Sequence, residues 1–213
     1  ISKDGLLATC GHVGRRPGRE LIAVFADGTE IRGRTLGQVL SHGVDCGLVQ
    51  LETEGRELPA VPLGTTAGLA KGDWLVALGY TQGLAGAVRP SLVRCGRVLY
   101  VGENELYFDA PIDAGDSGGP SFNLRGEVVG LNARCGRPSW QNIATNIDRL
   151  SERLETLKAQ VEAKDQPTDA VDSDRAHGGA GFGGGFQASD EGGKSDLDRS
   201  APLGAIAAGA EAA

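Results

Sequence analysis

A serine surrounded by small residues is the clearest chemical signal in the sequence. Residues 113–120 read DAGDSGGP, so Ser117 lies between glycines. Glycine adopts backbone conformations that other residues avoid, and such a segment can form a tight loop with its N–H groups turned inward. Two N–H groups aimed at one point beside a hydroxyl stabilise a negatively charged oxygen. The segment therefore predicts a nucleophilic serine with an oxyanion hole.

A serine nucleophile needs a base, and the chain offers three histidines. His177 lies in a glycine-rich segment and His42 in a polar loop, so neither is favoured. His12 follows the apolar run 6–10, which is typical of a short β-strand. Taken alone, a histidine at the end of a strand is more often structural than catalytic.

The base in turn needs an anion to orient it. Asp45 opens the apolar run 45–51, which places its carboxylate at the edge of the predicted core. Taken alone, an aspartate there more often caps a turn. The combination is more specific, because His12, Asp45 and Ser117 each lie at the border of a predicted strand. Together they predict a Ser-His-Asp triad.

The elements that position these residues are predicted to be short strands. Apolar segments separated by turns that contain glycine are typical of an all-β sandwich or barrel. They cover residues 6–10, 21–25, 30–35, 45–51, 74–79, 91–101, 106–109 and 128–133. A connection over residues 54–71 divides them into two groups. We therefore expect an all-β fold of two packed antiparallel β-barrels with a cleft between them.

The C-terminal part of the chain changes in character. Asn146 is a predicted helix N-cap, and apolar residues recur at helical spacing over 147–164. From residue 165 the sequence is rich in Gly, Ala, Asp and Ser and cannot bury much apolar surface. The predicted organisation is a domain that carries the predicted triad over 1–146, an amphipathic helix over 147–164 and a disordered tail or linker over 165–213.

Composition narrows the possible functions. The chain has 213 residues and a net charge of -7, which argues against nucleic-acid binding. No apolar run approaches the length of about 18 residues that a membrane span needs. The sequence lacks methionine and begins at Ile1, so we expect a fragment or processed product.

The cysteines have no CxxC spacing, and we predict neither a metal site nor a cofactor. Their even number permits two disulfides or four buried thiols: Cys10, Cys46, Cys95 and Cys135.

Three segments, 6–13, 44–51 and 113–132, resemble the histidine, aspartate and serine motifs of chymotrypsin-like serine proteases. Among these proteases, the chain is most similar to the bacterial HtrA/Deg type, over roughly residues 1–160. The resemblance implies two β-barrels with the triad in the cleft and no cofactor. It also implies a serine endopeptidase that forms an acyl-enzyme on polypeptide substrates, with a role in protein quality control or processing.

The resemblance assigns a role to each matched residue. Ser117 corresponds to the nucleophile, His12 to the general base and then acid, and Asp45 to the carboxylate that orients His12. The N–H groups of Gly115 and Ser117 correspond to the oxyanion hole. The strand expected to pair with an extended substrate backbone holds Asn132, Ala133 and Arg134.

The chain also departs from the family pattern. Asp116 stands where HtrA proteins usually have asparagine; in digestive proteases this aspartate pairs with a new N-terminal isoleucine. We reject that role for Ile1, which is too close to His12, and expect the first barrel to lack its first strand. No PDZ domain is predicted. Pro111 replaces the pocket-base aspartate of trypsin-like enzymes, which predicts cleavage after a small or medium apolar residue.

The exported setting of the family favours two disulfides and an extracytoplasmic location. The suggested pairs are Cys10–Cys46 and Cys95–Cys135. HtrA proteins are often trimers, so a homo-oligomer is compatible with the resemblance, but no segment specifies one.

Two alternatives also fit part of the pattern. The Gly-x-Ser-x-Gly pattern around Ser117 also fits an α/β-hydrolase elbow, which needs a helix after the serine and a later histidine. Here His177 is the only later histidine, and a hairpin is predicted after the serine. A catalytically silent protease-like module for binding or scaffolding is the second alternative. Retention of all three triad residues argues against it.

Overall fold

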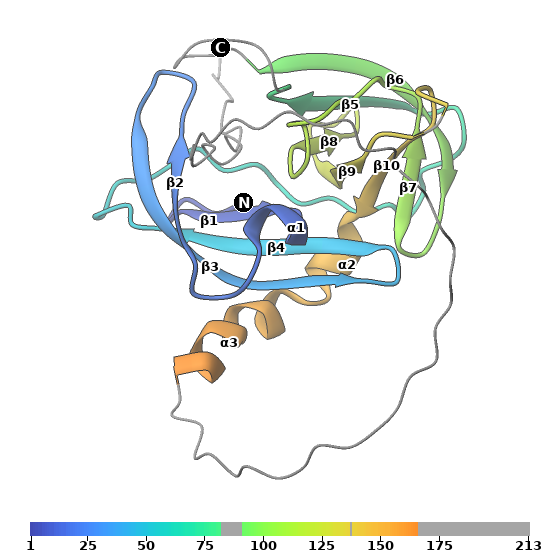
Figure 1. The fold of residues 1–213 in the computed structure, drawn as a ribbon. Helices are drawn as coiled ribbons and strands as arrows, with labels where there is room; N and C mark the ends of the chain where they lie inside the picture. The colour runs from blue at the N-terminus through green and yellow to red at the C-terminus, as the bar shows by residue number, and fades with distance from the viewer. Residues whose placement is uncertain (82–90, 137, 166–213) are drawn as a thin grey trace, which may run out of the picture. The chain divides into compact units, whose positions relative to one another are not determined.

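Strands dominate the computed structural model, which describes residues 1–81, 91–136 and 138–165 (Figure 1). The N-terminal lobe, residues 1–51, is a four-stranded antiparallel sheet in the order β1-β4-β3-β2. Its strands are β1 (Leu6–Thr9), β2 (Glu20–Val24), β3 (Glu30–Ser41) and β4 (Val44–Leu51). Residues 30–35 of β3 alternate between exposed and buried, so one face of the sheet packs on the core.

The second group of strands closes into a six-stranded barrel, with the order β10-β7-β6-β5-β8-β9. Its members are β5 (Trp74–Gly79), β6 (Leu92–Val101), β7 (Glu105–Phe108), β8 (Pro120–Phe122), β9 (Val128–Arg134) and β10 (Asn142–Asn146). This barrel confirms the all-β prediction. In the described residues the N-terminal lobe is an open four-stranded sheet, so one of the two predicted barrels is closed and the other is not.

Close to the candidate site, one detail differs from the prediction and another agrees with it. The first strand ends at Thr9, and the short helix α1 (Gly11–Gly14) follows it, so His12 lies in a helical turn. After Ser117 comes the strand β8, and no helix lies between them. The α/β-hydrolase alternative is therefore wrong.

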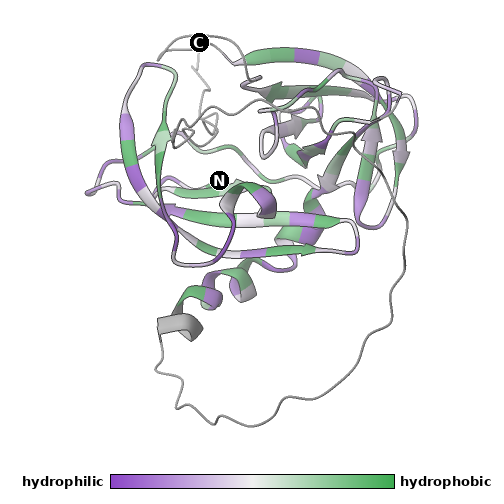
Figure 2. Cartoon of the chain, in the orientation of Figure 1, coloured by the Kyte–Doolittle hydropathy of each residue, from purple (hydrophilic) through white to green (hydrophobic). Residues whose placement is uncertain are grey.

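The predicted C-terminal helix is present as two pieces, α2 (Ile147–Ser151) and α3 (Leu154–Asp165). The N-cap prediction is confirmed, because the N–H of Asp148 donates to Oδ1 of Asn146 at 2.9 Å. Between the pieces the backbone tightens, and the N–H of Arg153 donates to the carbonyl of Leu150 at 3.0 Å. Apolar and polar residues alternate along α3 (Figure 2).

One hydrophobic cluster joins the two lobes and the helices. It combines residues of the N-terminal sheet, the barrel strand β9 and helices α2 and α3: Leu6, Cys10, Val44, Cys46, Leu48, Val128, Leu131, Ala133, Ile147, Leu150 and Leu157. The described residues accordingly fall into one compact unit.

Among the described residues, no helix combines the length and hydropathy needed to cross a membrane. The predicted tail beyond Asp165 lies outside the described residues.

Candidate active site

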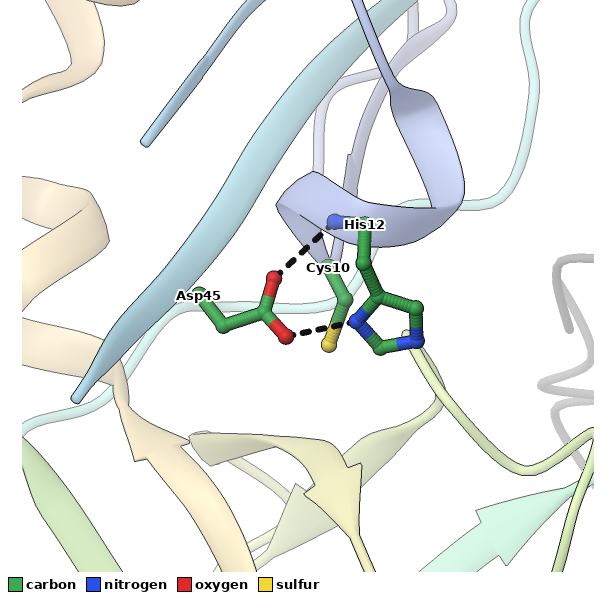
Figure 3. A group of neighbouring side chains, drawn as sticks. All are labelled: Cys10, His12 and Asp45. Carbon is green, nitrogen blue, oxygen red and sulfur yellow. Dashed lines mark hydrogen bonds and ion pairs between the residues drawn. The ribbon is translucent and has the colours of Figure 1, made fainter. Parts of the chain in front are cut away.

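His12 on α1 and Asp45, near the start of the inner strand β4, form a close pair (Figure 3). The ring nitrogen Nδ1 of His12 lies 2.6 Å from Oδ2 of Asp45. The backbone N–H of His12 also donates to Oδ1 of the same carboxylate at 3.1 Å. The two contacts fix both the position and the ring orientation of His12, as the predicted triad requires.

The local backbone is shaped for this pair. A Cβ on Gly11 would lie 2.6 Å from the carbonyl oxygen of Val39 and 3.2 Å from Oδ1 of Asp45, so only glycine fits there. The barrel also contributes, because the hydroxyl of Thr145 on β10 donates to the carbonyl of Asp45 at 2.9 Å. The N–H of Asp45 returns a hydrogen bond to that hydroxyl at 3.1 Å. Asp45 is thereby held from both lobes.

The pair shifts the acidity of both groups. The hydrogen bond to Asp45 raises the pKa of His12 above its ordinary value, against an opposing effect of burial. Burial raises the pKa of Asp45, but hydrogen bonds from His12 and Gly11 outweigh it and hold that pKa below its ordinary value. Asp45 is therefore ionised near neutral pH, and His12 is a stronger base than a free histidine.

The same bond selects the tautomer of His12. An ionised carboxylate only accepts hydrogen bonds, so Nδ1 carries the proton that Asp45 binds. The neutral ring then has its lone pair on Nε2, on the side away from Asp45 in Figure 3. This nitrogen can accept a proton, which is the chemistry expected of a general base.

Ser117 lies in a glycine-rich loop that packs against the segment before His12. A Cβ on Gly118 would lie 2.3 Å from Oγ1 of Thr9 and 3.2 Å from the backbone nitrogen of Cys10. The loop thus touches residues two and three positions before the histidine. The hydroxyl of Ser117 donates to the carbonyl of Ala133 at 3.4 Å. Among the described residues, no hydrogen bond joins it to His12.

The predicted oxyanion donors are in a suitable state. Gly115 has φ +99°, which glycine adopts easily, and Gly118 has φ +85°. The neighbouring amides of Asp116 and Gly118 donate to backbone carbonyls at 3.1 and 2.8 Å. Within the part of the chain that the structure describes, the N–H groups of Gly115 and Ser117 have no such partner. Their role as oxyanion donors stays a prediction.

Asn132 is buried and makes its hydrogen bonds within the protein, including bonds to the loop that holds Ser117. Its side chain is buried, donates to the carbonyl of Leu78 at 2.9 Å and accepts from the hydroxyl of Ser121 at 2.7 Å. Its backbone exchanges 2.8 Å hydrogen bonds with Gly118 and Gly119. Sequence reasoning assigned Asn132 to substrate pairing and missed this anchoring, for which the sequence carries no local signal.

The rest of the predicted substrate strand is differently placed. Ala133 is buried, and its carbonyl accepts the hydrogen bond from the hydroxyl of Ser117. Arg134 is exposed and pairs with Glu105 of β7, one strand beyond the neighbouring β10. Pairing of this strand with a substrate stays a prediction.

The cysteines are free thiols, so the structure contains neither predicted disulfide. Cys10 and Cys46 are buried, and burial raises the pKa of both, that of Cys46 to about 11. Cys95 and Cys135 are exposed. The protonated thiol of Cys10 donates to the carbonyl of Asn132 at 3.1 Å instead of bonding to Cys46.

Cys10, His12 and Asp45 place one potential ligand atom each within 4.8 Å of the others (Figure 3). A metal ion there would need the Cys10 thiolate and would displace the bond between His12 and Asp45. Because the pKa of Cys10 lies well above its ordinary value, the three groups are better suited to hydrogen bonding than to a cation.

Comparison with known proteins places this geometry in context. The sequence profile described as a trypsin-like peptidase domain matches residues 1–131. A protein of Bartonella henselae, named a probable periplasmic serine endoprotease and DegP-like, is 35% identical over 146 residues. That match covers 67% of this chain and 28% of the relative. A relative of the same name from Pseudomonas fluorescens is 37% identical over 138 residues, or 63% of this chain and 28% of the relative. The chain thus spans just over a quarter of each.

Solved structures agree with the sequence matches. The crystal structure of Deg5 is 26% identical, with a TM-score of 0.56 over 73% of this chain and 79% of Deg5. The serine endoprotease from Yersinia pestis, 23% identical, has a TM-score of 0.62 over 74% of this chain and 55% of its own. The latter supports the fold alone.

Proposed function

Because the chain belongs to the trypsin-like peptidase family and is an HtrA-like protease domain, we propose that it is a serine-type endopeptidase that uses Ser117, His12 and Asp45. One observation carries the proposal: Nδ1 of His12 is bound to Asp45 at 2.6 Å, which leaves Nε2 as the basic nitrogen of a histidine adjoining the serine loop. A histidine in this state can activate a hydroxyl near neutral pH.

The proposed reaction begins when the Ser117 hydroxyl leaves its long contact with Ala133 and turns toward Nε2 of His12. Contacts between catalytic groups are often long before substrate binds. Oγ then bonds to the scissile carbonyl carbon, and its proton passes to Nε2. His12 returns that proton to the leaving amine as the C–N bond breaks, which leaves an acyl-enzyme. A water molecule, activated by the same ring, hydrolyses the ester and restores Ser117.

Charge that develops during this reaction has matching partners. The N–H groups of Gly115 and Ser117, which have no partner among the residues that the structure describes, are proposed to bind the oxyanion. Asp45, buried and ionised, is proposed to stabilise the imidazolium of His12. Each oxyanion donor of this kind typically contributes on the order of 10²–10³ in turnover.

The wider role is proposed from the relatives, which are named periplasmic serine endoproteases. We propose an extracytoplasmic location, polypeptide substrates, and a role in protein quality control or processing. A homo-oligomer is compatible with this role. Cleavage after a small or medium apolar residue is proposed from Pro111 in place of an acidic pocket base.

A fluorophosphonate probe tests the function directly. We expect the wild-type protein to be labelled and to cleave an unfolded polypeptide, because the probe reacts only with an activated serine. Ser117→Ala should abolish both. Ser151→Ala, which removes an exposed hydroxyl on α2, should retain both.

The same experiment decides the alternative of a catalytically silent module for binding or scaffolding. A folded wild-type protein that neither reacts with the probe nor cleaves polypeptides would favour that alternative. If Ser117→Ala is still labelled, the nucleophile is a residue other than Ser117.

A further inference from the structure

A buried negative charge lies directly beside the proposed nucleophile. Asp116 precedes Ser117 and is 1% exposed. Its Oδ2 lies 3.0 Å from Nη1 of Arg94 on β6, whose side chain is 16% exposed. Its Oδ1 accepts the hydroxyl of Thr81 at 3.0 Å. A carboxylate this deeply buried is costly unless it is paired and hydrogen-bonded, and Arg94 supplies the charge.

Arg94 approaches from a rigid element. It lies on β6, opposite Ala77 of β5, within the closed barrel. Its Nη2 donates to the hydroxyl of Thr81, which in turn contacts the carboxylate of Asp116. The approach of Nη1 itself is close but not aligned for a hydrogen bond, so its attraction to Asp116 is ionic. The barrel wall thus holds the carboxylate by charge and through one shared hydroxyl.

The serine loop is folded around the same carboxylate. The N–H of Asp113 donates to Oδ2 of Asp116 at 2.8 Å, and the N–H of Asp116 donates to the carbonyl of Asp113 at 3.1 Å. The N–H of Gly119 donates to the carbonyl of Asp116 at 3.0 Å. The end of strand β5 also packs closely against this carboxylate, because a Cβ on Gly79 would lie 2.3 Å from Oδ1 of Asp116. The position of this carboxylate therefore sets the path of the backbone through Gly115 and Ser117.

We propose that Arg94 is a positioning residue for catalysis: through its ion pair with Asp116 it keeps the Gly115 and Ser117 amides and the serine hydroxyl in their reactive arrangement. The inference rests on the proposed function. The counterion of Asp116 comes from within the barrel. The nitrogen of Ile1 instead donates to the carbonyl of Leu6 at 2.8 Å, which agrees with the rejection of a paired N-terminal isoleucine.

A double-mutant cycle tests this role. Arg94→Gln, Asp116→Asn and the double variant would be compared with wild type for kcat, KM and the rate of fluorophosphonate labelling. Arg94→Gln leaves a buried carboxylate without its counterion, so we expect kcat and labelling rate to fall by about tenfold or more with KM within about threefold. In the Asp116→Asn background the same substitution should change kcat by less than about threefold, because the charge is already gone.

Arg97→Gln is the matched control. Arg97 lies on the same strand but is exposed, with its guanidinium 4.1 Å above the ring of Trp74. Its loss should leave kcat within about twofold, because its guanidinium contacts Trp74 and the carbonyl of Gly72 and not Asp116.

Each outcome decides the question. Equal loss in both backgrounds, or an Arg94→Gln variant with wild-type kcat, would overturn the positioning role while leaving the protease assignment intact. If Arg94→Gln does not fold, the double variant decides: kcat near that of Asp116→Asn supports the role, and a further loss of about tenfold contradicts it. An inactive wild type would overturn both proposals.

Discussion

The hydrogen bond between Nδ1 of His12 and Asp45 determines most of the chemistry available at the scale of single residues. It orients the ring, fixes the tautomer and raises the pKa of the base. Burial of Asp45 strengthens each effect, because water does not compete for the carboxylate.

This pKa shift predicts the pH dependence of the enzyme. Only neutral His12 accepts the serine proton, so kcat/KM should rise with pH and level off above the raised pKa of His12. The inflection should lie above the ordinary histidine value of about 6.5. Asp45→Asn removes the anion, so the inflection should move down and kcat should fall on the order of 10⁴-fold. Rate profiles between pH 5 and 9 measure both.

His42→Asn is the control for this profile, since His42 is exposed and has φ +50°, which asparagine tolerates. It should leave the inflection in place. A rate that stays flat over the whole pH range would contradict the role of His12.

A second prediction at this scale concerns the serine loop. Gly118→Ala places a Cβ 2.3 Å from Oγ1 of Thr9, so the loop must shift and kcat should fall by about 10²-fold. Gly126→Ala is matched to it, with φ +77° and no atom within 4 Å of the new Cβ. Both variants carry backbone strain, but only the first displaces Ser117. Equal kcat in the two variants would show that the contact with Thr9 does not position the loop.

At the scale of elements, helix α3 is fitted to strand β3 at a bulge. The register of β3 against β4 shifts between Thr35 and Gly37. Gln160 on α3 bonds to both backbone groups of Gln38, at 2.9 and 3.3 Å. A Cβ on Gly37 would lie only 2.2 Å from the carbonyl oxygen of Leu157, which is too close for two unbonded atoms. The helix is therefore part of the folded domain.

This close approach predicts the effect of one methyl group. Gly37→Ala should lower the free energy of unfolding by about 1–3 kcal/mol, because the helix backbone must move away from the strand. Gly14→Ala meets only ordinary contacts at 3.5 Å and beyond, and should lie within about 0.5 kcal/mol of wild type. Urea denaturation followed by circular dichroism compares them. Similar midpoints for the two variants would mean that α3 does not pack on Gly37.

At the scale of the whole molecule, each lobe has a hydrophobic cluster of its own, and the two lobes also share a third cluster and a buried hydrogen bond. Ile147 and Leu150 of α2 pack in the same cluster as Leu48 of the sheet and Leu131 of the barrel. Thr145 of the barrel bonds to Asp45 of the sheet. If one lobe unfolded alone, apolar side chains of the other lobe would be exposed to water.

We therefore expect a single unfolding transition. Both tryptophans, Trp74 and Trp140, follow the N-terminal lobe in sequence, so their fluorescence reports on the C-terminal lobe while circular dichroism reports on both. The two midpoints should coincide. Ile147→Ala should lower them together, with a cost of about 2–5 kcal/mol. Separate midpoints in wild type would contradict a shared core.

The sequence alone indicated most of the strands, though not β8 and β10, and the N-cap at Asn146; it also named the residues of the candidate site, whose roles stay predictions. These features depend on local chemistry: alternation of apolar residues, glycines at turns, and a hydroxyl in a glycine-rich loop. It also predicted correctly that Ile1 is not the partner of Asp116.

Only the tertiary structure decided which distant groups meet. Arg94 carries no local signal, yet folding of the barrel brings it 3.0 Å from Asp116. Asn132, assigned to substrate, anchors the serine loop. The four cysteines are free thiols: Cys10 and Cys46 are buried, and the thiol of Cys10 donates to the carbonyl of Asn132, whereas Cys95 and Cys135 are exposed. Contacts between residues remote in sequence depend on how the strands pack, and residue types and spacing do not specify that packing.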